Sequence, residues 1–497
     1  MTVPARLLPC NRYPMSDQYG PRAATAVALA VAVSALFTAP AVTQTKERVA
    51  ASIDARLGTY SDVALKIWSY AEVGYQEEKS SGLLQSQLRD AGFTIESGVA
   101  GMPTAFVASY GQGRPIIGIL AEFDALPGLS QAAEPTRRPL VEHGAGHGCG
   151  HHLFGTASTA AAIAVKDWLA ATARQGTIRL YGTPAEEGGS GKVYMVRAGL
   201  FKDVDAVISW HPGDENDAGP STNLANKSGK FRFRGVSAHA AGAPDRGRSA
   251  LDGVEAMNHM ANLMREHVPA ETRIHYVITS GGQAPNVVPD YAEVYYYVRH
   301  PDGRMVEAIW ERLVKASEGA ALGTGTTVEH EITGGTYSRL PNETLARVLD
   351  TNLRIVGGVK YTPEEQAFAE KLIATFSPTG RVLGSQETVQ PFARQVTNAS
   401  SDAGDVSWVV PSASFTAATF VPGTPGHSWQ AVAAGGTSIG IKGMAVAAKT
   451  LALSAVDLFQ SPTVLAAARQ EFERNRGPNF TYRALLGDRP PALDYRR

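Results

Sequence analysis

The chain has 497 residues, of which 44% are hydrophobic and 19% charged, and its formal net charge is −1. This composition is typical of a folded protein and excludes a disordered chain. A chain of this length is expected to form two or three folding units. The near-neutral charge provides no electrostatic footprint for nucleic acid or for an anionic membrane surface, so we expect neither as a partner.

The N-terminal segment has the pattern of a secretory signal. Residues 23–37 (AATAVALAVAVSALF) form an apolar run without charge, and residues 39–41 (APA) offer small side chains at a cleavage position. The run is short for a membrane span. We therefore expect a signal peptide over 1–41 and a secreted or periplasmic chain that begins near Val42 and has no stable membrane span. An uncleaved anchor is the alternative, and Met15 is an alternative start.

The chain has two cysteines, Cys10 and Cys149. Cleavage near Ala41 removes Cys10, so the mature chain has a single thiol and no internal disulfide. A single thiol in an oxidising compartment requires a reason. Coordination of Cys149 to a metal as a thiolate provides one.

Helix-like and strand-like segments alternate up to about residue 225. Helical periodicity covers three segments, 46–72, 80–91 and 154–171. Short apolar runs typical of buried strands cover four more, 104–110, 115–121, 177–181 and 206–210. This alternation predicts an α/β fold with a mainly parallel sheet of the metallopeptidase kind. In such sheets, ligands lie beyond the carboxyl ends of the strands.

The pattern changes after about residue 226. The segments that follow have the order β-α-β-β-α-β, at 230–236, 249–266, 273–280, 292–299, 304–321 and 326–332. That order predicts a ferredoxin-like unit. We expect this lid or dimerisation domain to span 226–335 and to be inserted between two parts of the catalytic domain, 42–225 and 336–497. Residues 361–398 show only a partly helical pattern.

The run 115–121 is followed by two carboxylates, Glu122 and Asp124. These residues either orient metal ligands from behind or are ordinary solvated acids of a turn.

A glycine-rich segment at 146–152 (GHGCGHH) carries the clearest sign of metal chemistry. Cys149 and His151 are two residues apart, and a thiolate with an imidazole suits a borderline metal such as zinc. The predicted helix that follows would stabilise the thiolate with its N-terminal dipole. A flexible histidine-rich loop is the alternative. We interpret His143 and His147 as surface histidines.

Three further candidate positions follow predicted strands or lie in turns. Glu186 and Glu187 come after the run 177–181, and adjacent carboxylates point in different directions, so one can bind metal while the other acts as general acid or base. A solvated loop is the alternative. His211 follows the run 206–210, and His427 lies in a Gly-Pro turn. Five ligands suit two divalent ions that share one of them: Cys149, His151, Glu187, His211 and His427.

Taken in order, these motifs resemble the metallohydrolase family of aminoacylases, hippurate hydrolases and glutamate carboxypeptidases. Within that family they are most similar to the group of p-aminobenzoyl-glutamate hydrolase subunits. The resemblance runs through nearly the whole mature chain and includes the segments GHGCGHHLFGTAS (146–158), AEEGGSGKVYMVRAGLF (185–201), DVDAVISWHP (203–212), SAHAAGAPDRGRSALD (237–252), PNVVP (285–289), SSDAGDVSW (400–408) and GTPGHSWQ (423–430).

The resemblance implies a role for each matching residue. Cys149 corresponds to the ligand that bridges two metal ions, and Glu186 to the general base. His239 corresponds to a lid histidine that reaches an active site, often that of the partner subunit, and Asn286 to a lid residue near the substrate. The remaining metal ligands are His151, Glu187, His211 and His427. His152 departs from the family pattern, which has Asp or Asn there, so no carboxylate role is carried over.

The family further implies an amidohydrolase that uses two divalent ions, Zn or Mn, to cleave an N-acyl or N-aroyl amino acid such as p-aminobenzoyl-glutamate. A dipeptidase or carboxypeptidase with the same two-metal site is the alternative. A homodimer is expected, or an assembly with a different partner chain. Retention of both Glu186 and Glu187 speaks against an inactive relative. An enzyme with Cys149 as the nucleophile is a further alternative, which the surrounding histidines and glutamates disfavour.

Overall fold

The structure is a computed structural model that describes residues 44–496. The expected signal peptide and its cleavage position lie outside the described residues.

A six-stranded sheet forms the centre of the catalytic domain, in the order β1-β2-β4-β3-β5-β12. Its strands are β1 (Thr94–Ser97), β2 (Phe106–Gln112), β3 (Ile116–Ala121), β4 (Gly176–Gly182), β5 (Ala206–Gly213) and β12 (Ser412–Ala418). The four strands from β4 to β12 pair in parallel, and β1 and β2 pair antiparallel at one edge. The predicted mainly parallel α/β sheet is therefore confirmed.

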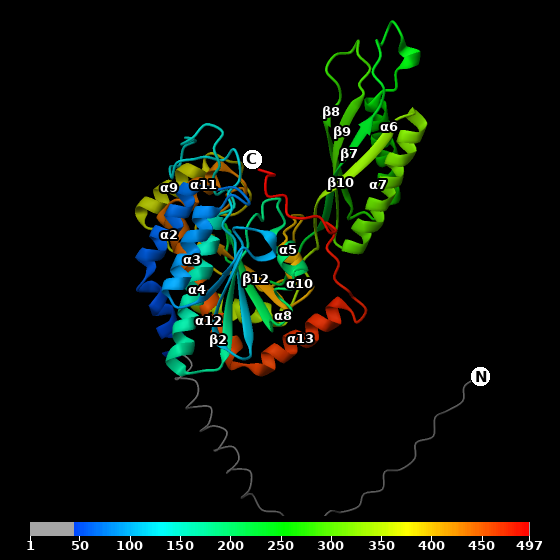
Figure 1. Cartoon of the computed structure of the whole chain (residues 1–497). Helices are drawn as coiled ribbons and strands as arrows, with labels where there is room; N and C mark the ends of the chain where they lie inside the picture. The colour runs from blue at the N-terminus through cyan, green and yellow to red at the C-terminus, as the bar shows by residue number, and fades with distance from the viewer. Residues whose placement is uncertain (1–43, 497) are drawn as a thin grey trace, which may run out of the picture. The chain divides into compact units, whose positions relative to one another are not determined.

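Helices cover this sheet, and two of them, α4 and α12, pack directly against it, while α2 and α3 pack on α4 (Figure 1). The helices are α2 (Leu57–Tyr70), α3 (Glu78–Asp90), α4 (His151–Thr172), α5 (Gly191–Arg197), α8 (Glu343–Val356), α9 (Pro363–Ile373), α10 (Ala403–Ser407), α11 (Trp429–Gly435), α12 (Ser438–Gln460) and α13 (Pro462–Arg476). By length and hydropathy α12 could span a membrane, but 83% of its apolar window is buried. It is therefore a core helix.

The inserted domain has its own antiparallel sheet, in the order β10-β7-β9-β8. Its elements are β7 (Ala225–Arg234), α6 (Ala250–Met264), β8 (Arg273–Ser280), β9 (Tyr291–His300), α7 (Gly303–Thr324) and β10 (Thr327–Thr336). A separate hydrophobic core around Phe231, Val294 and Leu313 joins the sheet to α6 and α7. The predicted β-α-β-β-α-β order is confirmed.

Some elements differ from the sequence-based expectation. The helical pattern over 46–72 divides at Arg56 into a helix over 44–54 and α2. The unclear region 361–398 contains α9 and then mostly irregular backbone. Strand β12 has no counterpart among the predicted elements, because its sequence SASFTAA is small and mixed rather than apolar or regularly alternating.

Candidate metal centre

The candidate residues gather at one edge of the central sheet. Strand β3 ends just before Glu122, β4 ends four residues before Glu186, and His211 lies near the end of β5. Because β3, β4 and β5 are parallel, their carboxyl ends meet at the same edge. Side chains from segments far apart in the sequence are thereby brought together.

Cys149 and His151 flank the start of α4. Gly150 between them is the helix N-cap and has φ 72°, a left-handed conformation that glycine adopts without strain. A Cβ at Gly150 would lie 2.7 Å from Pro212 Cβ, next to His211. The glycine therefore allows the Cys149 loop to approach the end of β5 closely.

Two groups of potential ligands share Cys149. One contains Cys149, His151 and His211, and the other contains Cys149, Glu187 and His427. Within each group the donor atoms all lie within 4.8 Å of one another. The structure thus brings together all five residues that the sequence predicted as ligands, in two sets that meet at one thiol.

Local hydrogen bonds fix the two flanking histidines. His211 Nδ1 lies 2.7 Å from the Pro212 carbonyl oxygen, which leaves Nε2 facing Cys149 Sγ at 3.5 Å. The backbone N–H of His427 donates to the Gly148 carbonyl (3.1 Å), and its Nε2 lies 3.2 Å from Glu187 Oε1. These backbone contacts hold each imidazole toward the shared thiol.

Asp124 connects the two groups from behind. Its Oδ1 lies 2.8 Å from His151 Nδ1, and its Oδ2 accepts a hydrogen bond from the Glu187 backbone N–H, also at 2.8 Å. A carboxylate that accepts Nδ1–H leaves the Nε2 lone pair of His151 free for a metal. Of the two interpretations of Asp124, its position supports the one in which it orients ligands.

Glu122 belongs to a buried charge cluster that the sequence did not reveal. Lys192 Nζ lies 2.8 Å from Glu122 Oε1 and 2.7 Å from Asp402 Oδ1, and all three side chains are at most 3% exposed. Lys192 and Asp402 lie within motifs that carry the family resemblance, but no spacing signal linked them. Burial alone would raise the pKa of Glu122, but Lys192 and His151 outweigh it and hold that pKa below its usual range.

The same environment alters the reactive groups. Burial alone would raise the pKa of the Cys149 thiol, but the neighbouring His211 and His151 lower it to about 6. Burial, together with the carboxylates of Glu122 and Glu187, raises the pKa of Glu186 well above its usual value. The site thus favours a thiolate at Cys149 and a proton on Glu186.

Several donor atoms have spare coordinating capacity. His151 Nε2 and Glu187 Oε1 are buried, and neither makes a hydrogen bond to any residue within 44–496. Buried polar atoms without partners are unfavourable unless something else satisfies them. A thiolate, imidazoles and a carboxylate with free lone pairs fit divalent cations.

The two neighbouring histidines are not surface or ligand residues. His147, which the sequence analysis expects at the surface, is 1% exposed, and its Nε2 lies 3.1 Å from the Ile67 carbonyl oxygen. The expectation was wrong because the glycine-rich loop turns inward. His152 is also buried, with Nε2 3.0 Å from the Gly435 carbonyl oxygen, and burial lowers its pKa to about 3. His143 is exposed, as predicted.

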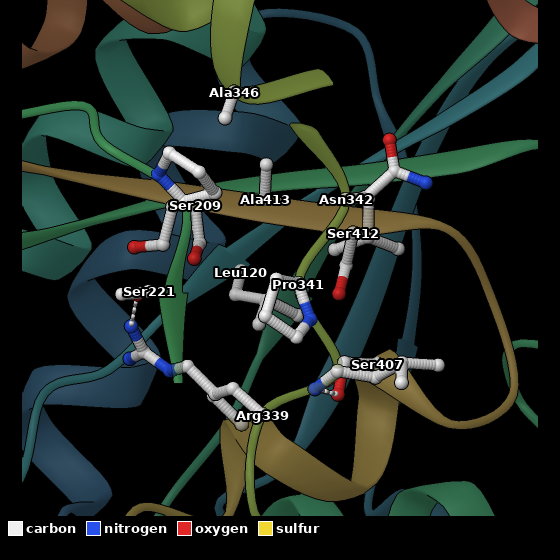
Figure 2. Close-up of a pocket in the computed structure, with 15 residues that line it drawn as sticks. Leu120, Ser209, Ser221, Arg339, Pro341, Asn342, Ala346, Ser407, Ser412 and Ala413 are labelled. Atoms are coloured by element: carbon white, nitrogen blue, oxygen red, sulfur yellow. Dashed lines mark hydrogen bonds between the residues drawn. The ribbon is translucent and has the colours of Figure 1, made fainter. Parts of the chain in front are cut away.

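A cavity of about 370 Å³ opens onto the candidate ligands. Glu186 and Arg339 both line it. Arg339 also lines an adjoining smaller pocket of serine and apolar side chains, where its guanidinium points toward Ser221 (Nη1 to Oγ, 3.4 Å; Figure 2). It forms no ion pair with any residue that the structure describes. Burial lowers its pKa, and nearby carboxylates oppose that effect. No sequence pattern pointed to this arginine.

The two lid residues lie together but not in this cavity. His239 and Asn286 are exposed, and the backbone N–H of Ala240 donates to the Asn286 carbonyl (3.0 Å). The backbone N–H groups of Ala241 and Gly242 donate to His239 Nδ1, at 3.2 and 3.0 Å. Nδ1 therefore accepts, and the neutral ring carries its proton on Nε2, which is available as a donor.

Comparisons with known proteins agree with this architecture. A family model described as a peptidase dimerisation domain matches residues 224–324. The chain is 44% identical over 452 residues to one of the subunits of p-aminobenzoyl-glutamate hydrolase from Escherichia coli (strain K12), covering 85% of this chain and 94% of that protein. It is 28% identical over 444 residues to Xaa-Arg dipeptidase of Mus musculus, covering 86% and 92%. The Bacillus subtilis YXEP protein, described as a dinuclear metal binding peptidase from the M20 family, superimposes with a TM-score of 0.57 at 18% identity, covering 82% of this chain and 99% of that chain.

Proposed function

The chain belongs to the M20 family and is a metal-dependent hydrolase of amide bonds, and on this premise we propose that it cleaves an N-acyl or N-aroyl amino acid such as p-aminobenzoyl-glutamate. The observation that supports this most is the meeting of two ligand groups at Cys149, with Glu186 beside them at the cavity wall. The identity to a p-aminobenzoyl-glutamate hydrolase subunit supports the aroyl amino acid as substrate.

Two divalent ions are proposed, each held by one ligand group. Cys149, His151 and His211 would hold one ion, and Cys149, Glu187 and His427 the other. Zn is favoured over Mn by the thiolate and imidazole donors. When bound, the ions would supply Lewis acidity toward the amide carbonyl and the attacking water.

Glu186 is proposed to move the proton. It accepts one from the attacking water as the new C–O bond forms and delivers it to the amine nitrogen as the C–N bond breaks, which yields a carboxylic acid and a free amino acid. The raised pKa of Glu186 suits this role, because a base poised near neutral pH can both take up and release a proton.

Arg339 is proposed to bind the carboxylate of the amino-acid part of the substrate. It lines the same cavity as Glu186 and lacks a carboxylate partner among the described residues. A guanidinium pairs with a carboxylate through two parallel hydrogen bonds, which would orient the amide toward Glu186.

The lid is proposed to complete the site after a movement or from a second copy of the chain. His239 presents an Nε2–H donor but does not line the cavity in this structure. A donor aimed at the developing oxyanion typically contributes a factor of about a hundred to a thousand in rate. Asn286 is proposed to approach the substrate with it, and the match to a dimerisation domain favours a dimer. A secreted or periplasmic location is proposed from the leader sequence alone.

A substrate panel tests the proposed function. The chain that begins at Val42 would be loaded with Zn or Mn and assayed with p-aminobenzoyl-glutamate, N-benzoylglycine and Xaa-Arg dipeptides. We expect the aroyl amino acids to have the highest kcat/KM and a chelator to abolish turnover. Turnover that survives removal of metal would favour Cys149 as a nucleophile instead.

Arg339 variants refine this test. Loss of a charged hydrogen-bond partner costs about 1.5–3 kcal/mol, so Arg339→Met should raise KM about tenfold to a hundredfold. The same variant should hardly change KM for the carboxamide analogue of the substrate. Equal effects on both substrates would contradict a carboxylate contact.

A dipeptidase is the second candidate. The similarity to Xaa-Arg dipeptidase extends over 86% of this chain and supports it. Both candidates use the same metal site and differ in the acyl group that the cavity accepts. A higher kcat/KM for Xaa-Arg than for p-aminobenzoyl-glutamate would favour the dipeptidase.

A further inference from the structure

The segment that follows α13 runs back across the catalytic domain to the candidate metal centre (Figure 1). Along its course, Arg197 Nη1 donates to the carbonyl oxygens of Gly487 and Arg489, both at 2.9 Å. Tyr194 donates its hydroxyl to the Pro490 carbonyl (3.2 Å). These side chains come from α5, directly after the Glu186–Glu187 loop, so the segment is fixed beside that loop.

The end of this segment contacts the backbone of the metal-ligand candidate Glu187. Tyr495 donates its hydroxyl to the Glu187 carbonyl oxygen (3.1 Å), and Arg496 Nη2 donates to the same oxygen (2.8 Å). The Arg496 guanidinium lies over the Tyr495 ring, 5.0 Å from its centroid. Both donors therefore converge on a single carbonyl.

The neighbouring residues leave room for this contact. Tyr495 packs edge-on against Tyr75, with ring centroids 5.7 Å apart. A Cβ at Gly74 would clash with the Tyr495 hydroxyl oxygen, so only glycine fits there with the tyrosine in place. Gln76 Nε2 donates to the Leu493 carbonyl (2.9 Å). The tail is thus seated in a fitted position at the 74–76 segment.

The Glu187 peptide is consequently held from two sides. Asp124 accepts its N–H, while Tyr495 and Arg496 donate to its C=O. The loop that carries Glu187 continues with glycines, and Gly188 has φ 99°, so the loop has little side-chain packing of its own. External hydrogen bonds are needed to keep such a backbone in one orientation.

We propose that Tyr495 and Arg496 are positioning residues for the metal site: they hold the Glu187 carbonyl so that the Glu187 carboxylate faces Cys149 and His427. The inference rests on the proposed two-metal site. It assigns the tail a specific effect on one ion, because Glu187 belongs to only one of the two ligand groups. The ion between Cys149, His151 and His211 should be held as before.

Metal titration of the full-length enzyme tests the proposal without relying on activity. Metal-free protein would be titrated with Co²⁺, following the thiolate charge-transfer and d–d absorption bands and the stoichiometry. The double variant Tyr495→Phe/Arg496→Ala should bind one ion with unchanged affinity and the second about tenfold to a hundredfold more weakly, the range typical for loss of outer hydrogen-bond partners of a metal ligand. Unchanged affinity for both ions would overturn the proposal.

Single variants cover the possibility that the double variant does not fold. Arg496→Ala keeps the tyrosine donor and should show a smaller loss at the second ion, and Arg496→Lys should recover part of it because the ammonium is also a donor. Equal weakening of both ions in Arg496→Ala would indicate general loosening of the fold and would count against the proposal.

A matched control separates the tail from general surface changes. Tyr110→Phe/Arg474→Ala removes the same chemical groups from β2 and α13, away from Glu187, and should leave both affinities unchanged. If the unmodified enzyme bound fewer than two ions, the proposed two-metal site itself would be wrong. If it bound two and the double variant did too with equal affinities, only the role of the tail would fall.

Discussion

Replacement of Lys192 by methionine would remove the cation that pairs with both Glu122 and Asp402 in the buried cluster beside the metal centre. At the observed separations of 2.8 and 2.7 Å, each attraction is about 6 kcal/mol with an effective dielectric constant of about 20. Most of this is offset by the cost of removing three charges from water. Because methionine preserves the bulk of the side chain, the variant would test charge rather than packing.

The expected loss follows from the two carboxylates that remain. Removal of one partner from a buried ion pair costs about 3–5 kcal/mol, because the remaining charge is neither solvated nor paired. We therefore expect the free energy of unfolding to fall by about 3–5 kcal/mol at about pH 8. The measurement is urea unfolding followed by tryptophan fluorescence, with the midpoint shift multiplied by the m-value.

The loss should become smaller at lower pH. Without Lys192, burial raises the pKa of both carboxyl groups in the folded state above their unfolded values. The folded variant then binds protons more readily than its unfolded chain, so its stability increases as the pH falls. The difference from the unmodified protein should therefore be smaller at about pH 5.5 than at about pH 8.

An exposed ion pair provides the control. Lys449 and Asp54 lie 2.6 Å apart, with side chains 22% and 51% exposed, and Lys449→Met should cost less than about 1 kcal/mol. A loss below about 1 kcal/mol for Lys192→Met, with no dependence on pH, would refute the assignment of Lys192 as the charge that neutralises this cluster.

Four further predictions concern the site and the leader. Glu186→Gln should retain both metal ions and lose a factor of about a hundred to ten thousand in kcat, whereas Glu187→Ala should mainly lose one ion by metal analysis; near-normal turnover of Glu186→Gln would contradict its role. His239→Ala should keep its metal content and lower kcat about a hundredfold to a thousandfold, and mixing it with Glu186→Gln protein should restore some activity if the histidine acts across a dimer. In the metal-free chain that begins at Val42, alkylation of Cys149 should accelerate as the pH rises through about 6, and added Zn should protect the thiol; an inflection above about pH 8 would contradict the electrostatics described above. N-terminal sequencing of the exported protein should begin near Val42, and a cytoplasmic protein that retains its leader would contradict export.

The sequence alone determined features that are encoded within short segments. The alternation of strands and helices predicted the sheet, and the β-α-β-β-α-β order predicted the inserted domain, because both patterns repeat within tens of residues. Cys149 with His151, and Glu186 with Glu187, are recognisable in the same way. Each pair occupies a glycine-containing segment after a predicted strand or before a predicted helix, so its chemistry is visible locally.

Tertiary structure alone decided which distant groups meet. Lys192 pairs with Asp402, 210 residues away, and Tyr495 reaches the carbonyl of Glu187, 308 residues away. The polar loop around His147 predicts a surface residue, yet the loop folds inward and buries it. Periodicity and spacing describe neighbours along the chain. Contacts between remote segments depend instead on how helices and strands pack, and that packing decides which buried charges acquire partners and which peptide groups of the metal site are held in place.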